Sequence, residues 1–234
     1  MKRERLDRFL SNQLNISRSE VKAAIKHGTA TVNGVTVKDS GYFVDTQNDT
    51  VIYNGEKINY KRFIYLVMNK PSGIITASSD KHQRTVLDLI PQNLRRRNLA
   101  PVGRLDKDTT GLLILTDDGD FAHRCISPKN EIEKSYIAEL DGDIDESIIK
   151  GFRTGVVLSD GYRCKPAKLY RLSQNKARVA ITEGKYHQIK RMFGVFSIGV
   201  NHLHRESIGN LKLPKTLAEG ECVEIDNIQR IIMP

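Results

Sequence analysis

The sequence predicts an α+β protein in two parts, a small helix-and-hairpin domain over residues 1–60 and a larger domain over residues 61–234. The first sixty residues hold two short amphipathic helical patterns followed by one hairpin signal. The remainder alternates short apolar runs with Gly, Asp and Asn turns, and helical patterns in it are fewer than strand patterns. A mixed, largely antiparallel sheet with flanking helices fits the larger part best.

The two helices of the smaller domain have clear sequence signals. The first is set by apolar residues at the spacing of one helical face, namely Leu6, Phe9, Leu10 and Leu14. The second begins at a capping box, because Ser17 stands three residues before Glu20, and it ends at Gly28. Residues 29–37 then alternate like a strand pair around Asn33-Gly34, the dipeptide that most readily forms a tight hairpin turn.

Three basic residues, Arg18, Lys22 and Lys26, recur every four positions on the second helix. A solvated helix face explains such a row, and so does a ridge that contacts phosphate groups. The residues alone leave both interpretations open.

The elements of the larger domain follow from the same patterns. We expect strands over residues 63–68, 111–116, 135–140, 155–158, 167–172 and 177–182. We expect helices over residues 85–90, 121–126, 145–152 and 185–196.

Charge favours a polyanionic partner. The chain has 37 Lys and Arg against 28 Asp and Glu, a formal net charge of +9, and the excess gathers over residues 81–107 and 184–215. The arginines at 95–97 are either a solvated helix end or an RNA contact.

The longest apolar run, residues 63–68, is too short to span a bilayer, and no secretion signal is evident. The three cysteines form neither a metal-binding pair nor a disulfide framework. We therefore expect a cytoplasmic protein that does not bind membranes.

The densest polar stretch, residues 100–119, leads from a turn-rich loop into a buried strand. Asp106 and Asp108 precede the strand and Asp117, Asp118 and Asp120 follow it, about 15 Å away at roughly 3.3 Å per residue. Carboxylates so far apart do not suit a two-metal site, whose ions lie about 3.5–4 Å apart. The second group is explained as a turn and a cap for the next helix. Asp106 has no such structural role, and it is our candidate for catalysis.

His202 and His204 share one face of a strand, as two metal ligands can. No cysteine or carboxylate nearby completes a site, and we expect no metal.

Three segments of the smaller domain carry a family resemblance: R-L-D-R-F-L at residues 5–10, I-S-R-S-E-V at 16–21 and V-N-G-V at 32–35. Together they resemble the RNA-binding domain named after ribosomal protein S-four. The resemblance implies contact with structured RNA through the second helix, which carries Arg18, Lys22 and Lys26, and through the loop before it.

The larger domain shows a longer signature, G-R-L-D-K-D-T-T-G-L-L-I-L-T-D-D-G at residues 103–119. Three companions share its order in the chain: K-P-S-G at 70–73, E-K-S-Y at 133–136 and E-G-K-Y-H-Q-I-K-R-M-F at 183–193. These motifs closely resemble the pseudouridine synthases of the ribosomal small-subunit type.

The resemblance assigns roles to five residues. Asp106 matches the family's catalytic carboxylate, Tyr136 its active-site tyrosine, and Lys190 the basic residue that pairs with the carboxylate. Leu203 matches an apolar position beneath the target base, and Arg104 matches the arginine that helps to displace the nucleotide.

The chemistry of uridine isomerisation agrees with these roles. The glycosidic bond must break and the uracil must rejoin the sugar through carbon 5, which calls for a group that attacks or stabilises an electron-poor centre. An aspartate is ionised at pH 7, and a nearby cation keeps it so. The target nucleotide must be flipped out of folded RNA, at about a few kcal/mol. Basic residues such as Arg191, beside Lys190, are expected to contact phosphates.

We therefore expect a monomeric enzyme that converts one uridine of small-subunit ribosomal RNA to pseudouridine without cofactor or metal. Its partner would be ribosomal RNA or an assembling ribosomal subunit. Three alternatives remain: a synthase acting on large-subunit RNA, a non-catalytic RNA-binding or assembly factor, and a metal-dependent nuclease.

Overall fold

The computed structural model describes residues 3–226, 228 and 232, and the chain forms two compact units. The smaller unit comprises the residues up to Ile64 together with Pro91–Leu99, and the larger comprises Tyr65–Ile90 and the residues from Ala100 onward. We expected the larger domain to begin at residue 61 and therefore to include residues 91–99. In the structure, residues 91–99 pack with the smaller unit.

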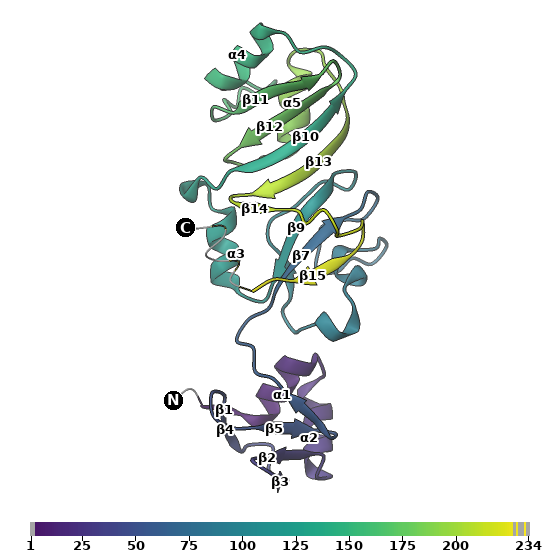
Figure 1. Ribbon diagram of the computed structural model, residues 1–234, viewed down its shortest axis with the longest axis vertical. Helices are drawn as coiled ribbons and strands as arrows, with labels where there is room; N and C mark the ends of the chain where they lie inside the picture. The colour runs from purple at the N-terminus through teal and green to yellow at the C-terminus, as the bar shows by residue number, and fades with distance from the viewer. Residues whose placement is uncertain (1–2, 227, 229–231, 233–234) are drawn as a thin grey trace. The chain divides into compact units, whose positions relative to one another are not determined.

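The described part of the smaller unit consists of two α-helices, the short 3-10 helix η2 (Gln92–Leu94) and two small sheets (Figure 1). Its helices are α1 (Leu6–Leu14) and α2 (Arg18–Lys26). A four-stranded antiparallel sheet has the order β3-β2-β5-β6, formed by β2 (Ala30–Val32), β3 (Val35–Val37), β5 (Val51–Tyr53) and β6 (Glu56–Ile58). The strands β1 (Arg3–Arg5) and β4 (Phe43–Asp45) pair separately.

The local signals of the smaller unit are confirmed. Ser17 and Glu20 form both hydrogen bonds of the capping box at the start of α2. Asn33 and Gly34 have positive φ angles, 52° and 81°, and join β2 to β3 in a tight hairpin. The apolar face of α1 packs with α2 and the sheet in one core.

Two arginines of residues 91–99 attach that segment to the smaller unit. Arg96 donates hydrogen bonds to the carbonyl oxygens of Asn12, at 3.3 Å, and Lys61, at 3.0 Å. Arg97 donates to the hydroxyl of Ser11 at 2.9 Å. These side chains therefore have a structural role that the sequence did not reveal.

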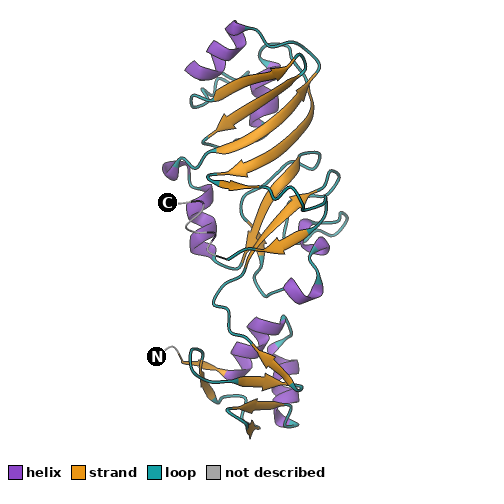
Figure 2. Cartoon of the chain, viewed as in Figure 1, coloured by secondary structure: helices purple, strands orange, loops and turns teal. Residues whose placement is uncertain are grey.

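The larger unit is built on one nine-stranded sheet (Figure 2). Its strand order is β11-β12-β10-β13-β9-β7-β15, with β14 beside β13 and β8 beside β9. The strands are β7 (Tyr65–Lys70), β8 (Ala100–Pro101), β9 (Thr110–Thr116), β10 (Lys134–Leu140), β11 (Lys168–Ser173), β12 (Lys176–Ile181), β13 (Val200–Ile208), β14 (Leu211–Lys212) and β15 (Cys222–Glu224). Every described pair is antiparallel except β9 with β13. The prediction of a mixed, largely antiparallel sheet is confirmed.

Short helices flank this sheet: η1 (Val86–Leu89), α3 (Gly119–Ile126), η3 (Pro128–Asn130), α4 (Glu146–Thr154) and α5 (Gln188–Gly194). Asp118 caps α3 by accepting a hydrogen bond from the amide of Phe121, which confirms the expected capping role of this acidic group. Phe152 of α4 packs against Phe193 of α5, with ring centroids 4.8 Å apart. Among the described residues, no helix combines the length and apolarity needed to cross a membrane.

Three expected elements differ from the structure. The segment expected as a helix over residues 85–90 is a short 3-10 helix, η1. The strand expected over 155–158 is absent, and Val157 makes only an isolated bridge to Arg163. Helix α5 begins at Gln188 rather than at 185, because His187 has a left-handed backbone with φ 48° and cannot belong to the helix.

The parallel pairing of β9 with β13 joins the two halves of the sheet and requires a glycine. Arg205 lies opposite Gly111, which has φ +100°. A Cβ atom there would overlap the Arg205 backbone, coming within 2.8 Å of its amide nitrogen. Gly111 therefore lets the signature loop, which ends at β9, lie close against β13.

Candidate active site

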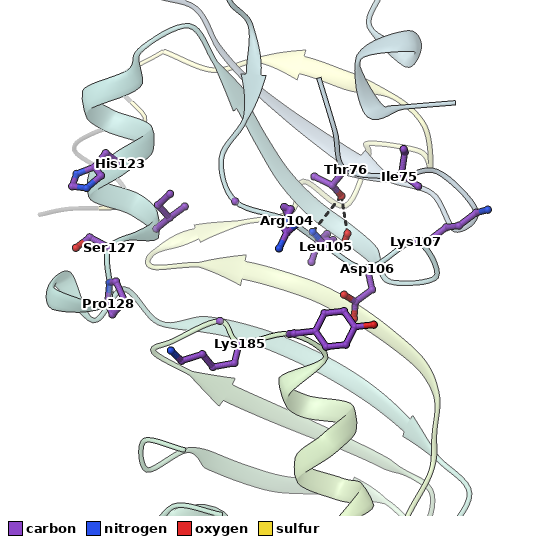
Figure 3. Close-up of a pocket in the computed structure, with 14 residues that line it drawn as sticks. Ile75, Thr76, Arg104, Leu105, Asp106, Lys107, His123, Ser127, Pro128 and Lys185 are labelled. Atoms are coloured by element: carbon purple, nitrogen blue, oxygen red, sulfur yellow. Dashed lines mark hydrogen bonds between the residues drawn. The ribbon is translucent and has the colours of Figure 1, made fainter. Parts of the chain in front are cut away.

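Asp106 lies on the loop between β8 and β9, and hydrogen bonds hold this loop in place. The carbonyl of Asp106 accepts a hydrogen bond from the amide of Thr109 at 3.1 Å, which closes a tight turn. On its other side, the hydroxyl of Thr76 donates to the carbonyl of Leu105 at 2.8 Å and accepts from its amide at 3.2 Å (Figure 3). The turn therefore presents the Asp106 carboxylate from a constrained backbone.

Lys70, at the end of β7, anchors the same loop from inside. Its side chain is fully buried, and its ammonium group donates to the carbonyls of Pro71, Lys107 and Thr109 at 3.0, 3.1 and 2.8 Å. Burial lowers the pKa of Lys70 to about 8, although the carboxylates of Asp108 and Asp106 act against this shift. The sequence analysis gave Lys70 no role. The signal that could have indicated one was a lysine at the end of an otherwise apolar, buried strand.

Asp106 lies beside an imidazole and an aromatic ring. Its Oδ1 atom is 3.5 Å from Nε2 of His187, and its side chain is 29% exposed. Asp106, Tyr136 and His187 line one small hollow of about 80 Å³. Asp106 and Tyr136 therefore line the same cavity.

The expected pairing of Asp106 with Lys190 is absent. Lys190 instead contacts both carboxylate oxygens of Asp108, at 2.7 and 2.6 Å, and this hydrogen bond lowers the pKa of Asp108. His187 directly precedes α5, and Lys190 lies in the first turn of that helix. The start of α5 meets the turn, so that His187 reaches Asp106 while Lys190 reaches Asp108.

Arg205 on β13 holds Tyr136 from the neighbouring strand. The two residues are partners in the β10–β13 register. Arg205 Nη1 donates to the Tyr136 hydroxyl at 3.4 Å, its guanidinium carbon lies 5.9 Å from the ring centroid, and Nε donates to the carbonyl of Leu112 at 2.7 Å. Its Nη2 atom has no hydrogen-bond partner among the described residues. The sequence analysis did not predict a role for Arg205. The only signal for one was the presence of a charged residue within a strand-like segment.

A larger cleft of about 730 Å³ adjoins the hollow, and Arg104, Asp106 and Lys185 line both. Figure 3 shows Arg104 and Lys185 on facing sides of this cleft, and His123 and Ser127 at its far end. The side chain of Lys107 points away, toward Gln83, to whose side-chain oxygen it donates at 2.8 Å. The cleft thus combines one carboxylate with several basic groups.

Leu203 and Arg191, which were expected to contact the substrate RNA, line neither cavity. Leu203 is buried on β13 opposite Ala138 of β10. Arg191 bonds to the carboxylate of Asp160 at 2.5 Å.

In the smaller unit, the row on α2 is organised by a buried carboxylate. Asp7 accepts hydrogen bonds from Arg18 at 3.0 and 2.9 Å and from Arg5 at 3.2 and 3.1 Å, and Lys22 lies 3.8 Å away. Burial alone would raise the pKa of Asp7, but the hydrogen bonds from Arg5 and Arg18 lower it below its ordinary value. Lys26 is exposed and makes no ion pair among the described residues.

The histidine pair on β13 contacts a hydroxyl. His202 Nε2 and His204 Nδ1 lie 3.1 and 2.8 Å from the oxygen of Thr110. Among the described residues, no three His, Cys, Asp or Glu side chains gather in a way that could hold a metal ion.

Comparison with known proteins specifies the family of the chain. Residues 64–194 match the RNA pseudouridylate synthases, and residues 4–51 match the S4 domain, the S-four type expected from the sequence. The chain belongs to the RNA pseudouridylate synthase family.

Individual relatives cover nearly the whole chain. An uncharacterised RNA pseudouridine synthase of Bacillus subtilis, YtzG, is 42% identical over 94% of both chains. The ribosomal small subunit pseudouridine synthase A of Vibrio cholerae is 38% identical over 93% of this chain and 94% of its own. The enzyme of the same name from Escherichia coli is 36% identical over the same shares. A crystal structure of a pseudouridylate synthase, 34% identical, covers 96% of this chain and 97% of its own with a TM-score of 0.67.

Proposed function

We propose that this protein converts a specific uridine of small-subunit ribosomal RNA to pseudouridine, with Asp106 as the catalytic carboxylate. The observation that carries the proposal is the position of Asp106, on a constrained turn at the junction of the small hollow and the basic cleft. The small-subunit synthases of Vibrio cholerae and Escherichia coli, both similar along nearly their full length, support ribosomal RNA as the substrate.

The neighbours of Asp106 suit this reaction. The reaction breaks the bond between N1 of uracil and the sugar and makes a bond from carbon 5, so every atom stays within one nucleotide and neither a cofactor nor a metal is required. The imidazole of His187 flanks the carboxylate, with its Nε2 atom 3.5 Å from Oδ1 of Asp106. Tyr136 offers an aromatic face for the uracil, held by Arg205.

Basic groups would bind the RNA. Arg104 lines the cleft with Asp106, and we infer that it contacts the displaced nucleotide. In the S4 domain, Asp7 orients Arg18 while the charges of Lys22 and Lys26 complete a cationic ridge for phosphates. We further infer that the enzyme works as a cytoplasmic monomer on ribosomal RNA or on an assembling subunit.

Replacement of Asp106 by asparagine tests the proposal. Asparagine keeps the size of the side chain and removes its charge, so we expect tritium release from 5-tritiated uridine in small-subunit RNA to fall about a hundredfold or more. Asp120→Asn is the matched control, because Asp120 is an exposed carboxylate on α3 outside both cavities. Undiminished tritium release from the Asp106 variant would reject the catalytic role and favour a non-catalytic RNA-binding factor.

A pseudouridine map identifies the substrate. Cells that lack the protein should lose one pseudouridine from small-subunit RNA, and cells that express only the Asp106→Asn variant should lose the same one. Loss of a large-subunit pseudouridine instead would assign the enzyme to the other subunit.

A further inference from the structure

Tyr186 is an exposed aromatic residue in the cleft that contains Asp106. The residue is 71% exposed, the highest value among the large apolar and aromatic residues exposed in the described part of the larger unit. It lines the cleft together with Arg104, Asp106 and Lys185. Single exposed apolar residues are common on protein surfaces, so exposure alone does not indicate a function.

The ring of Tyr186 is held by stacking on one side. It lies nearly parallel to the imidazole of His187, with an interplanar angle of 20° and centroids 3.8 Å apart. That imidazole lies 3.5 Å from Asp106. Because His187 covers one face and the side chain is largely exposed, the opposite face of the Tyr186 ring is available to a ligand.

The backbone that carries Tyr186 is also fixed. The buried carboxylate of Glu183 accepts hydrogen bonds from the Tyr162 hydroxyl at 2.7 Å, the amide of Lys165 at 2.9 Å and the side chain of Gln188 at 2.7 Å. The oxygen of Gln188 accepts from the amide of Lys185 at 2.9 Å. The residues on both sides of Tyr186 are therefore anchored, and a ligand that stacks on its ring does not have to order the segment first.

Tyr186 and the position expected for the target uracil belong to different cavities. Tyr136 lines the small hollow, whereas Tyr186 lines only the cleft of about 730 Å³. A volume of this size is typical of sites for ligands larger than a single base, about 300–1,000 Å³. Unpaired RNA bases are commonly bound by stacking on tyrosine.

We propose that Tyr186, stacked on His187, is a platform for the base of a nucleotide next to the target uridine, and so reads the RNA context of the modified position. The inference rests on the proposed function, since it places a neighbour of the substrate uridine in the same cleft. Tyr186 is a recognition residue here and takes no part in bond breaking.

The test combines changes in the protein with changes in the RNA. Tyr186→Ala, Tyr186→Phe and the control Tyr170→Ala are compared, Tyr170 being a 55% exposed tyrosine on β11 outside both cavities. The substrate is small-subunit ribosomal RNA assembled by splinted ligation, alone or with ribosomal proteins, in whichever form the wild type modifies. In separate substrates, one nucleotide on either side of the mapped uridine is made abasic.

Stacking on an aromatic side chain contributes about 1–3 kcal/mol per base, so we expect Tyr186→Ala to lower kcat/KM about five- to a hundredfold. Tyr186→Phe and Tyr170→Ala should stay within about twofold of the wild type. One abasic position should weaken the wild type by a similar factor and leave Tyr186→Ala unaffected. A purely structural role of Tyr186 would not abolish sensitivity to that missing base.

Wild-type turnover by Tyr186→Ala, or equal sensitivity of both proteins to every abasic position, would overturn the inference. Either result leaves the proposed function intact as long as the wild type modifies the RNA and Asp106→Asn does not. Failure of the wild type to modify any ribosomal RNA would instead reject the proposed function.

Discussion

Replacing Gly111 with alanine should separate the two halves of the sheet in the larger unit at the point where the signature loop meets β13. The new methyl group would overlap the Arg205 backbone and lie 3.0 Å from Cε1 of His204. Backbone atoms of a central strand cannot move aside as the end of a flexible side chain can. The strand β13 must therefore shift, or the turn that carries Asp106 must.

The cost follows from two contributions. A φ of +100° is strained for alanine by about 1–3 kcal/mol. Relieving the overlap would stretch the hydrogen bonds of the parallel β9–β13 pair, at about 1 kcal/mol for each bond lost. Two residue pairs make up this pairing, so with about two bonds lost we expect a total of about 3–5 kcal/mol. For a unit of this size, about 2–4 °C of melting temperature is lost per kcal/mol, or about 6–20 °C altogether.

Thermal unfolding followed by far-UV circular dichroism measures this loss. The matched control is Gly119→Ala, because a Cβ at Gly119 meets no atom within 4 Å and the residue begins α3. Alanine favours helices, so the control should melt at or slightly above the wild-type temperature. The unfolding of the smaller unit should be the same in all three proteins.

Tritium release should fall with the Gly111 substitution, because Arg205 holds Tyr136 from the displaced strand. If the Gly111→Ala protein melts within about 2 °C of the wild type, the backbone contact is not the reason for glycine at this position. The sheet would then be shown to adapt at its parallel junction.

Two further predictions concern buried charges. Lys70→Met removes the group that donates hydrogen bonds to the carbonyls of Pro71 and Thr109. We expect at least tenfold slower tritium release with an unchanged circular dichroism spectrum. An unchanged rate of tritium release would show that the loop does not need this anchor. Because the pKa of Lys70 is about 8 in the folded chain and about 10.4 when unfolded, the unfolded chain binds more protons between these values. This residue's contribution to the free energy of unfolding therefore rises with pH across that window, and the rise in urea midpoint should be smaller in Lys70→Met. Asp7→Asn weakens charged hydrogen bonds from Arg18 and should destabilise the smaller unit by about 1–3 kcal/mol, measured by hydrogen exchange. Because folding lowers the pKa of Asp7, this residue stabilises the folded chain at pH values above its ordinary pKa, and the stabilisation is lost as the pH falls through the pKa of the folded state. An Asp7→Asn protein as stable as the wild type at neutral pH would contradict this account.

Local signals in the sequence were sufficient for much of the fold. The capping box at Ser17 and the Asn33-Gly34 turn depend on residues a few positions apart, so their outcome could be predicted without tertiary information. The expected helix over 185–196 was less accurate, because nothing local indicated the left-handed conformation of His187.

From the sequence, Asp106 could be placed on a polar loop before a buried strand, and the order of the motifs indicated the family. Which groups face that carboxylate was decided only by the tertiary structure. Strand register brings Arg205 to Tyr136 across 69 positions, and the docking of α5 gives His187 to Asp106 and Lys190 to Asp108. Contacts between residues so distant in the chain depend on strand pairing and packing, which periodicity within a single segment does not specify.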